Sequence, residues 1–351
     1  MRSKALKIMT VAALALPMIM ASYVEAEADS SLTGGGYAAS GQLENVGYMA
    51  QLYDASNGLP TSDANYVLAA SDGYIYIGGY SGIIRYDGSS FERLDGSTGM
   101  TSGRALMEDT RGRLWIGTND NGVVMLDGEN IKRYTYEDNL PSSSIRTFAE
   151  GGDGKIYIGS TGGVSYVDNA GKLHNVADPR VTGTTIVRLV SDAEGKVYGN
   201  TKDGAIFRIE DGAVAGFHTT NELGTEIIST IYADPSNPGK VYLGTESNVI
   251  YYGDFGARAH DMKKIGVSPA DNTYWITSAC GRIWITCENY IGYIDETDRF
   301  RTLEHIPMNN SIDMMTSDYQ GNLWFASSRQ GVMKVVTNNF QNVTRTAGLN
   351  L

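Results

Sequence analysis

The stretch Gly112-Arg113-Leu114-Trp115 decides the fold, because its pattern returns six more times along the chain. In each copy a glycine stands three residues before an aromatic residue, usually with a basic and then an aliphatic residue between them. The aromatic positions are Tyr76, Trp115, Tyr157, Tyr198, Tyr242, Trp284 and Trp324. They are separated by 39, 42, 41, 44, 42 and 40 residues, so the chain contains seven units of nearly equal length.

The residues around this stretch predict four short antiparallel strands in each unit. Asp109 precedes the glycine, and this order is typical of a turn that the aspartate side chain caps while the glycine takes a positive φ. A strand beginning at Leu114 then ends at a second turn, at Gly122. A third strand, Val123 to Leu126, leads to the hairpin turn Asp127-Gly128 and a fourth strand.

Four strands in forty-odd residues, repeated seven times, predict an all-β fold: a seven-bladed β-propeller of four-stranded antiparallel blades. A β-helix needs a shorter period, and an array of β-sandwiches gives no reason for seven equal units. The recurring aromatic residues could be read as a sugar-binding array. A residue that returns in every unit is instead expected to pack between blades.

The first residues resemble an export signal. Arg2, Lys4 and Lys7 form a basic start, residues 8–20 are mostly apolar, and Ala26-Glu27-Ala28 suits signal peptidase. We therefore expect a signal peptide over 1–28, with an uncleaved anchor as the alternative, a flexible linker over 29–45 and the propeller over 46–345. The net charge of −12 disfavours nucleic acid and anionic lipid as partners.

The chain has two cysteines, Cys280 and Cys287. Export makes a disulfide possible. If Gly281-Arg282 is a tight turn, however, Cys280 lies opposite Ile283 and the two cysteines do not face each other. We therefore expect two free thiols.

Several of these motifs resemble the two-component regulator propeller repeat. The resemblance rests on Asn57-Gly58-Leu59-Pro60, on residues 112–118 and on Asn139-Leu140-Pro141, and it covers residues 50–351. Asn200 and Thr286 depart from the pattern, because other units have glycine or alanine there. The resemblance implies the extracytoplasmic sensor region of a bacterial membrane-bound receptor, ahead of an output such as a histidine kinase or a GGDEF-type diguanylate cyclase.

Both ends of the chain look like parts of a further unit. Residues 346–351 resemble the start of another repeat, with an unrelated tail as the alternative. Val46 to Tyr53 resembles an orphan fourth strand, which could instead close the ring with the last blade. These patterns lead us to expect the front part of a longer protein.

The candidate ligand site lies at the channel end of the inner strands. Eleven residues before the aromatic position stand Asn65, Arg104, Arg146, Val187 and Asp313. Two arginines at equivalent places on neighbouring blades could hold a carboxylate or a sugar acid, with ordinary ion pairing to loop carboxylates as the alternative.

The loops between the second and third strands share that face and vary most between units, which suits ligand specificity. They contribute the remaining candidates, Tyr80, Asn119, Asp120, Tyr290 and Arg329. Asn119 to Gly122 faintly resembles a calcium loop but is better read as a plain turn. The four histidines have no metal-like spacing, and we expect no metal, no cofactor and no catalytic residue.

These observations favour a ligand-sensing propeller that binds a small molecule, with carbohydrate as one class, and relays to an output domain outside this chain. Dimerisation would then occur through the full-length receptor. A cell-envelope scaffold for protein–protein contact and a propeller lyase or glycosidase are the alternatives.

Overall fold

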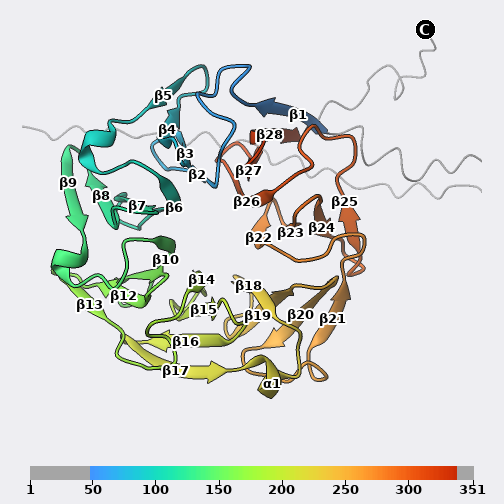
Figure 1. Cartoon of the computed structure of the whole chain (residues 1–351). Helices are drawn as coiled ribbons and strands as arrows, with labels where there is room; N and C mark the ends of the chain where they lie inside the picture. Colours follow the sequence, from blue (N-terminus) through green and yellow to red (C-terminus); the bar gives the residue numbers. More distant parts are fainter. Residues whose placement is uncertain (1–47, 338–351) are drawn as a thin grey trace, which may run out of the picture. The chain divides into compact units, whose positions relative to one another are not determined.

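The computed structural model describes residues 48–337, which form seven four-stranded antiparallel sheets arranged as blades around a centre (Figure 1). The predicted seven-bladed propeller is therefore confirmed. The expected signal peptide, the expected linker over 29–45, the propeller bounds at 46 and 345, and the repeat start at 346–351 all lie outside the described residues. Among the described residues, no helix is long and apolar enough to cross a membrane.

In blades 1 to 6 the strands follow one another outward from the centre. Blade 1 holds β2 (Tyr66–Ala69), β3 (Ile75–Gly79), β4 (Gly82–Tyr86) and β5 (Phe91–Arg93); blade 2 holds β6 (Gly103–Glu108), β7 (Leu114–Thr118), β8 (Val123–Asp127) and β9 (Asn130–Tyr134); blade 3 holds β10 (Ile145–Glu150), β11 (Ile156–Ser160), β12 (Gly163–Val167) and β13 (Leu173–Asn175).

The next three blades repeat this order. Blade 4 holds β14 (Ile186–Ser191), β15 (Val197–Thr201), β16 (Ile206–Glu210) and β17 (Ala213–His218); blade 5 holds β18 (Ile228–Ala233), β19 (Lys240–Thr245), β20 (Val249–Asp254) and β21 (Lys263–Gly266); blade 6 holds β22 (Trp275–Ala279), β23 (Arg282–Thr286), β24 (Ile291–Ile294) and β25 (Phe300–Thr302). A short helix, α1 (Thr220–Leu223), follows β17.

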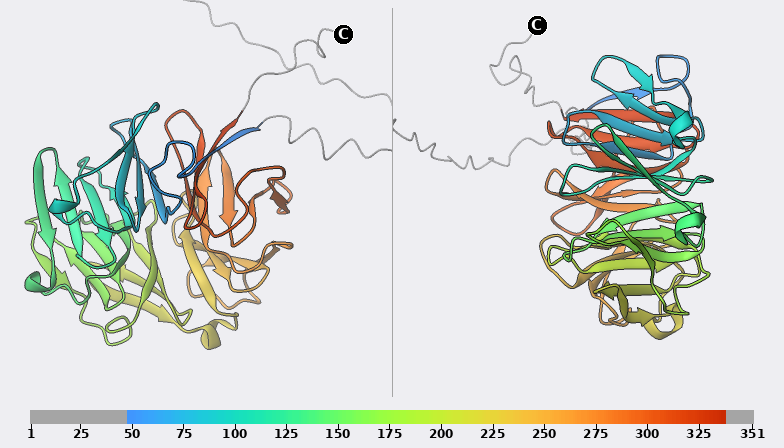
Figure 2. Two further views of the ribbon diagram at one scale, coloured as in Figure 1. Left: turned by 45° about the horizontal axis from the view of Figure 1, so that its top comes forward. Right: turned by 90° about the vertical axis from the view of Figure 1, so that its left-hand side faces the viewer.

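Blade 7 is built from both ends of the described chain. It holds β26 (Ile312–Ser317), β27 (Leu323–Ser327) and β28 (Gly331–Thr337), and its outermost strand is β1 (Tyr48–Tyr53). Strand β1 pairs antiparallel with β28 from Tyr48 opposite Thr337 to Tyr53 opposite Val332, and the two lie side by side in Figures 1 and 2. The N-terminal strand therefore closes the ring, which was the second of the two roles considered for it.

The recurring aromatic residues pack between blades, as expected. Trp115 is fully buried against Ile145 and Phe148 of the next blade. Its indole Nε1 also donates to Asp109 Oδ2 at 2.8 Å, and Arg113 Nε donates to the same oxygen at 2.6 Å. The aspartate that caps the turn thus also anchors the aromatic ring, and Trp324 repeats this contact with Asp318 at 2.9 Å.

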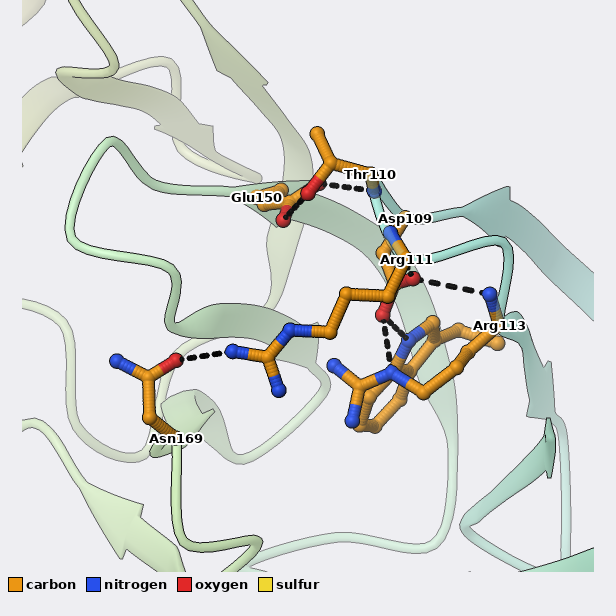
Figure 3. Close-up of polar contacts among 7 residues, drawn as sticks. Asp109, Thr110, Arg111, Arg113, Glu150 and Asn169 are labelled. Atoms are coloured by element: carbon orange, nitrogen blue, oxygen red, sulfur yellow. Dashed lines mark hydrogen bonds and ion pairs between the residues drawn. The ribbon is translucent and has the colours of Figure 1, made fainter. Parts of the chain in front are cut away.

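The same turn joins neighbouring blades (Figure 3). Thr110 donates through its backbone nitrogen, at 2.8 Å, and its hydroxyl, at 2.6 Å, to the carboxylate of Glu150 on β10. Arg111 Nη2 donates to Asn169 Oδ1, which belongs to blade 3 as Glu150 does, at 2.8 Å. Ser71 makes the equivalent contact with Glu108 from blade 1 to blade 2, so the contact between adjacent blades recurs.

The cysteine hairpin differs by one residue from the expected register. Its turn is Cys280-Gly281, in which Cys280 has φ 51° and Gly281 φ 73°, because Ala279 pairs with Arg282. Cys280 therefore lies in the turn rather than opposite Ile283. Both cysteines are nevertheless free, with Cys280 exposed and Cys287 buried, as expected.

Candidate functional site

The inner strands carry a bulge at the same place in blade after blade. In five blades the pairing between the first and second strands slips by one residue. The extra residues are Arg104, Arg146, Val187, Ser229 and Asp313. Asn65 and Tyr274 take this place in blades 1 and 6, since each directly precedes the residue that pairs with Gly78 or Thr286. A bulge locally twists a strand and re-aims its side chains.

All seven bulge residues line a single cavity of about 330 Å³ at the centre of the ring. The residues that follow them in the chain contribute as well, namely Tyr66, Arg188, Thr230, Trp275 and Met314. Glu288 and Ser311 complete the lining. The structure thus brings Asn65, Arg104, Arg146 and Asp313 together in one place.

Sequence counting missed Ser229 and Tyr274, because the hairpins of blades 5 and 6 have other lengths. Ala233 pairs with Val241 across a seven-residue connection, whereas Ala279 pairs with Arg282 across two residues. A fixed offset of eleven from the aromatic residue therefore fails in these two blades. Counting four residues back from the end of the inner strand finds Ser229 but gives Trp275 in place of Tyr274 in blade 6.

One side of the cavity is cationic. Arg104, Arg146 and Arg188 come from three consecutive blades, and each donates to a neutral oxygen. The acceptors are Asn65 Oδ1 at 2.9 Å, Asn119 Oδ1 at 3.4 Å and Thr230 Oγ1 at 3.1 Å, respectively. No ion pair between described residues includes these arginines, although the charge of Arg104 acts on the carboxylates of Asp63 and Asp313 from a greater distance.

Arg188 is the most buried of the three, with 4% of its surface exposed. Its guanidinium carbon lies 3.5 Å from the centroid of the Trp275 ring, and the edge of Tyr66 meets the same indole with ring centroids 5.8 Å apart. Burial lowers the pKa of Arg188 to about 10 and raises the pKa of Tyr66 to about 12. Burial also lowers the pKa of Arg146, and the positive charge of Arg104 adds to that effect.

The opposite side of the cavity is acidic. Glu288 accepts from the Tyr274 hydroxyl at 2.6 Å and from Ser311 at 3.1 Å. The Tyr274 hydrogen bond lowers the pKa of Glu288, with Ser311 and Arg329 contributing. Burial raises the pKa of Asp313, although a hydrogen bond from the Ser328 backbone, at 2.8 Å, and the positive charge of Arg104 oppose it. The cavity therefore has two electrostatic poles.

The candidate loop residues divide between the rim and other places. Asn119 contacts Arg146, and Arg329 lies near Glu288. Tyr80 is 68% exposed, and its backbone nitrogen donates to the carboxylate of Asp63. Asp120 instead accepts from Ser102 at 2.8 Å within its own blade, and Tyr290 lines a separate depression beside His305.

The histidines lie away from the central cavity, and none of them lines it. His174 contacts Asp168 at 2.8 Å, His218 packs against Phe255, and His260 is exposed. Within residues 48–337, no group of three or more histidine, cysteine, aspartate or glutamate side chains could hold a metal ion.

Residues 98–120 match the family model of the two component regulator propeller. This segment includes β6, β7 and the stretch that decides the fold. The resemblance noted in the sequence is therefore confirmed. No curated protein sequence shows a significant match to the chain.

Solved structures with the same fold include lyases and receptor domains. A streptogramin B lyase has a TM-score of 0.71 at 16% identity, covering 84% of this chain and 99% of its own. A catalytically inactive histidine-to-alanine variant of virginiamycin B lyase from Staphylococcus aureus, with quinupristin, has a TM-score of 0.66 at 15% identity. The match covers 82% of this chain and 99% of that one. The extracellular domain of a putative hybrid two component system from B. thetaiotaomicron has a TM-score of 0.68 at 19% identity, and the match covers 85% of this chain. This chain spans only 42% of that domain.

Proposed function

We propose that this chain, a member of the two-component regulator propeller repeat family, is the extracytoplasmic sensing region of a bacterial signal-transduction receptor. In this proposal the propeller binds a small molecule, with carbohydrate fragments as one class, in the central cavity. It then relays occupancy to an output domain outside this chain, and the full-length receptor supplies the membrane tether and any dimer contact. The receptor domain with the same fold supports this assignment.

The observation that carries the proposal is the contrast between two repeated positions. The aromatic position holds only tyrosine or tryptophan in all seven blades, because it is part of the scaffold. The bulge position holds asparagine, arginine, valine, serine, tyrosine and aspartate, and every one of these side chains lines the same cavity. A structurally constant position with variable chemistry around a concave surface is what a binding site requires.

We favour binding without turnover and assign the carboxylates of Asp313 and Glu288 in the cavity lining to contacts with ligand hydroxyl groups. A propeller lyase or glycosidase, which could use these carboxylates as general acid and base, is the alternative. The similarity to the solved lyases, at 15–16% identity, is a similarity of fold alone. A scaffold role would use the outer surface and would not explain the cavity.

The test uses a variant that fills the cavity without changing its charge. Val187 and Val336 are matched, since their exposed fractions are 37% and 36%, but only Val187 lines the cavity. Thermal denaturation of wild type, Val187→Trp and Val336→Trp is followed with a panel of small metabolites and carbohydrate fragments. A ligand present at a hundred times its Kd stabilises the folded state by about 2.7 kcal/mol.

We expect a compound that raises the Tm of wild type and Val336→Trp but not that of Val187→Trp. Equal stabilisation of both variants would show that the compound binds elsewhere and would refute the cavity as the sensing site. A panel in which nothing stabilises wild type would also count against the proposal.

A further inference from the structure

We infer that the cavity is built for a small hydroxylated monocarboxylate of the hexuronate type. This inference rests on the proposed function and names its ligand class. The carboxylate lies against Arg146 and Arg188, with Arg104 beside them, and the hydroxyl groups donate to Asp313 and Glu288 on the opposite side.

Within the described residues, no carboxylate lies within ion-pair distance of Arg104, Arg146 or Arg188, although the charges of Asp63 and Asp313 act on Arg104 from farther away. Carboxylates outnumber basic side chains by forty to twenty-eight in this chain. Arginines elsewhere use them: Arg113 pairs with Asp109 at 2.6 Å and Arg180 with Asp178 at 2.6 Å. Three consecutive blades nevertheless place arginines at the cavity with only neutral acceptors within the described residues.

Burial of Arg188 is unfavourable for its charge. The residue is 4% exposed, and burial lowers its pKa to about 10, so the folded protein disfavours the charged form. A group that only supported the scaffold could be apolar at this position, as Ala105 is in blade 2. A buried cation without an anion is instead explained by an anion that arrives with the ligand.

The Arg188 guanidinium is held in a fixed orientation. Trp275 covers one face of the Arg188 guanidinium, and Thr230 accepts one of its five N–H donors. The remaining donors lie in the plane of the group, which is the direction from which a carboxylate binds arginine with two parallel hydrogen bonds. Stacking therefore holds the guanidinium ready for such a ligand before it binds.

The acidic side determines which anion fits. Asp313 and Glu288 repel further negative charge, so a phosphate or a dicarboxylate that spanned the cavity would bring like charges together. Hydroxyl groups, by contrast, donate to carboxylate oxygens. The cavity volume lies near the lower end of the range of about 300–1,000 Å³ for small-molecule sites, which suits a single sugar ring better than a polymer.

The experiment compares compounds that differ only in the carboxylate. Isothermal titration with D-glucuronate and D-galacturonate is set against D-glucose, D-galactose and inorganic phosphate. Wild type is compared with Arg188→Met, with Arg146→Met as the second variant should the first fail to fold, and with Arg113→Met as the control outside the cavity. We expect at least one uronate to bind wild type and Arg113→Met, and to bind either cavity variant at least tenfold more weakly.

Four results would overturn the inference. The first is a neutral hexose that binds as tightly as its uronate, and the second is phosphate that binds more tightly than both uronates. The third is uronate binding that survives both cavity substitutions, and the fourth is failure of both uronates to bind wild type. The proposed function is separable. A neutral sugar that stabilises Val336→Trp but not Val187→Trp would keep the cavity as the sensing site and discard only the uronate.

Discussion

The guanidinium of Arg188 stacks on the indole of Trp275 at 3.5 Å, although blade 5 separates the two residues along the ring. Tyr66, from blade 1, meets the same indole edge-on. Three side chains from non-adjacent blades therefore meet across the centre, where most contacts of a propeller join only neighbours. This cluster forms part of the wall of the cavity and sets its charge.

Replacing Arg188 by methionine is expected to stabilise the ligand-free protein. Methionine keeps apolar volume against Trp275 and removes a charge whose burial is unfavourable, so we expect the free energy of unfolding to rise by about 1 kcal/mol after the lost stacking is counted. Urea denaturation followed by circular dichroism at pH 7 measures the change. A binding site that costs stability is the expected trade-off.

Arg113→Met is the matched control, and its effect should have the opposite sign. Arg113 pairs with Asp109, whose side chain is fully buried, so its removal leaves an acceptor with fewer donors. We expect a loss of about 1–3 kcal/mol. If Arg188→Met destabilises the protein as much as Arg113→Met does, Arg188 is a structural residue and its charge is not held for a ligand.

The scaffold was predictable because one residue pattern serves it in every blade. Trp115 and its equivalents fill the same pocket between blades, and Asp109 and Gly112 form the same turn. The same residue types therefore recur at a regular spacing along the chain. The closing strand was only half predictable. The sequence of residues 48–53 indicates a strand, but the residues of an edge strand do not specify which other strand it pairs with.

The site was less predictable because it depends on bulges. In a regular strand Val187 and Arg188 would point to opposite faces, so placing Val187 at the channel excluded its neighbour. The bulge at this position lets both side chains line the cavity. Arg188, its most buried cation, was therefore missed, and so was Trp275 from blade 6.

Asp109→Asn is expected to weaken the blade contact in a pH-dependent way. Burial raises the pKa of Asp109, but hydrogen bonds from Trp115 and Arg113 outweigh burial and lower it overall. A lowered folded pKa means that the carboxylate stabilises the protein above about pH 4 and loses this effect as the pH falls through the folded value. We expect a loss of about 1–2 kcal/mol at pH 7.

Urea titrations of wild type and Asp109→Asn at pH 7 and pH 3 measure this dependence. The difference between the two proteins should shrink at the lower pH. Asp127→Asn, at an exposed turn position of the same blade, should change stability by less than about 0.5 kcal/mol at pH 7. A difference that is equal at both pH values would contradict a role for the Asp109 charge.

The two thiols should differ in reactivity. Cys280 is exposed in its turn, whereas Cys287 is 1% exposed and burial raises the pKa of its thiol, which disfavours the reactive thiolate. We expect Ellman's reagent to label one thiol per native chain at pH 8 and two in urea. Native Cys280→Ser should show no rapid labelling. Rapid labelling of this variant would mean that Cys287 is accessible.

Substitution of Tyr53, the last residue of β1, is the strongest test of ring closure. Its ring packs edge-on against Phe91, with centroids 5.3 Å apart, and stacks near Trp324 at 6.3 Å. It therefore joins blade 7 to blade 1 as well as closing blade 7. Truncating a buried aromatic side chain of this kind costs about 3–5 kcal/mol, so Tyr53→Ala should lower the midpoint of urea unfolding substantially.

Tyr136→Ala removes the same side chain at a position that is 72% exposed, and it should change stability by less than about 0.5 kcal/mol. Limited proteolysis adds a positional readout. Because β1 pairs only with β28 in its sheet, Tyr53→Ala should expose cleavage sites near β1 and β28 before sites in blades 2 to 5. If both tyrosine variants are equally stable and cleave alike, β1 does not hold the ring closed.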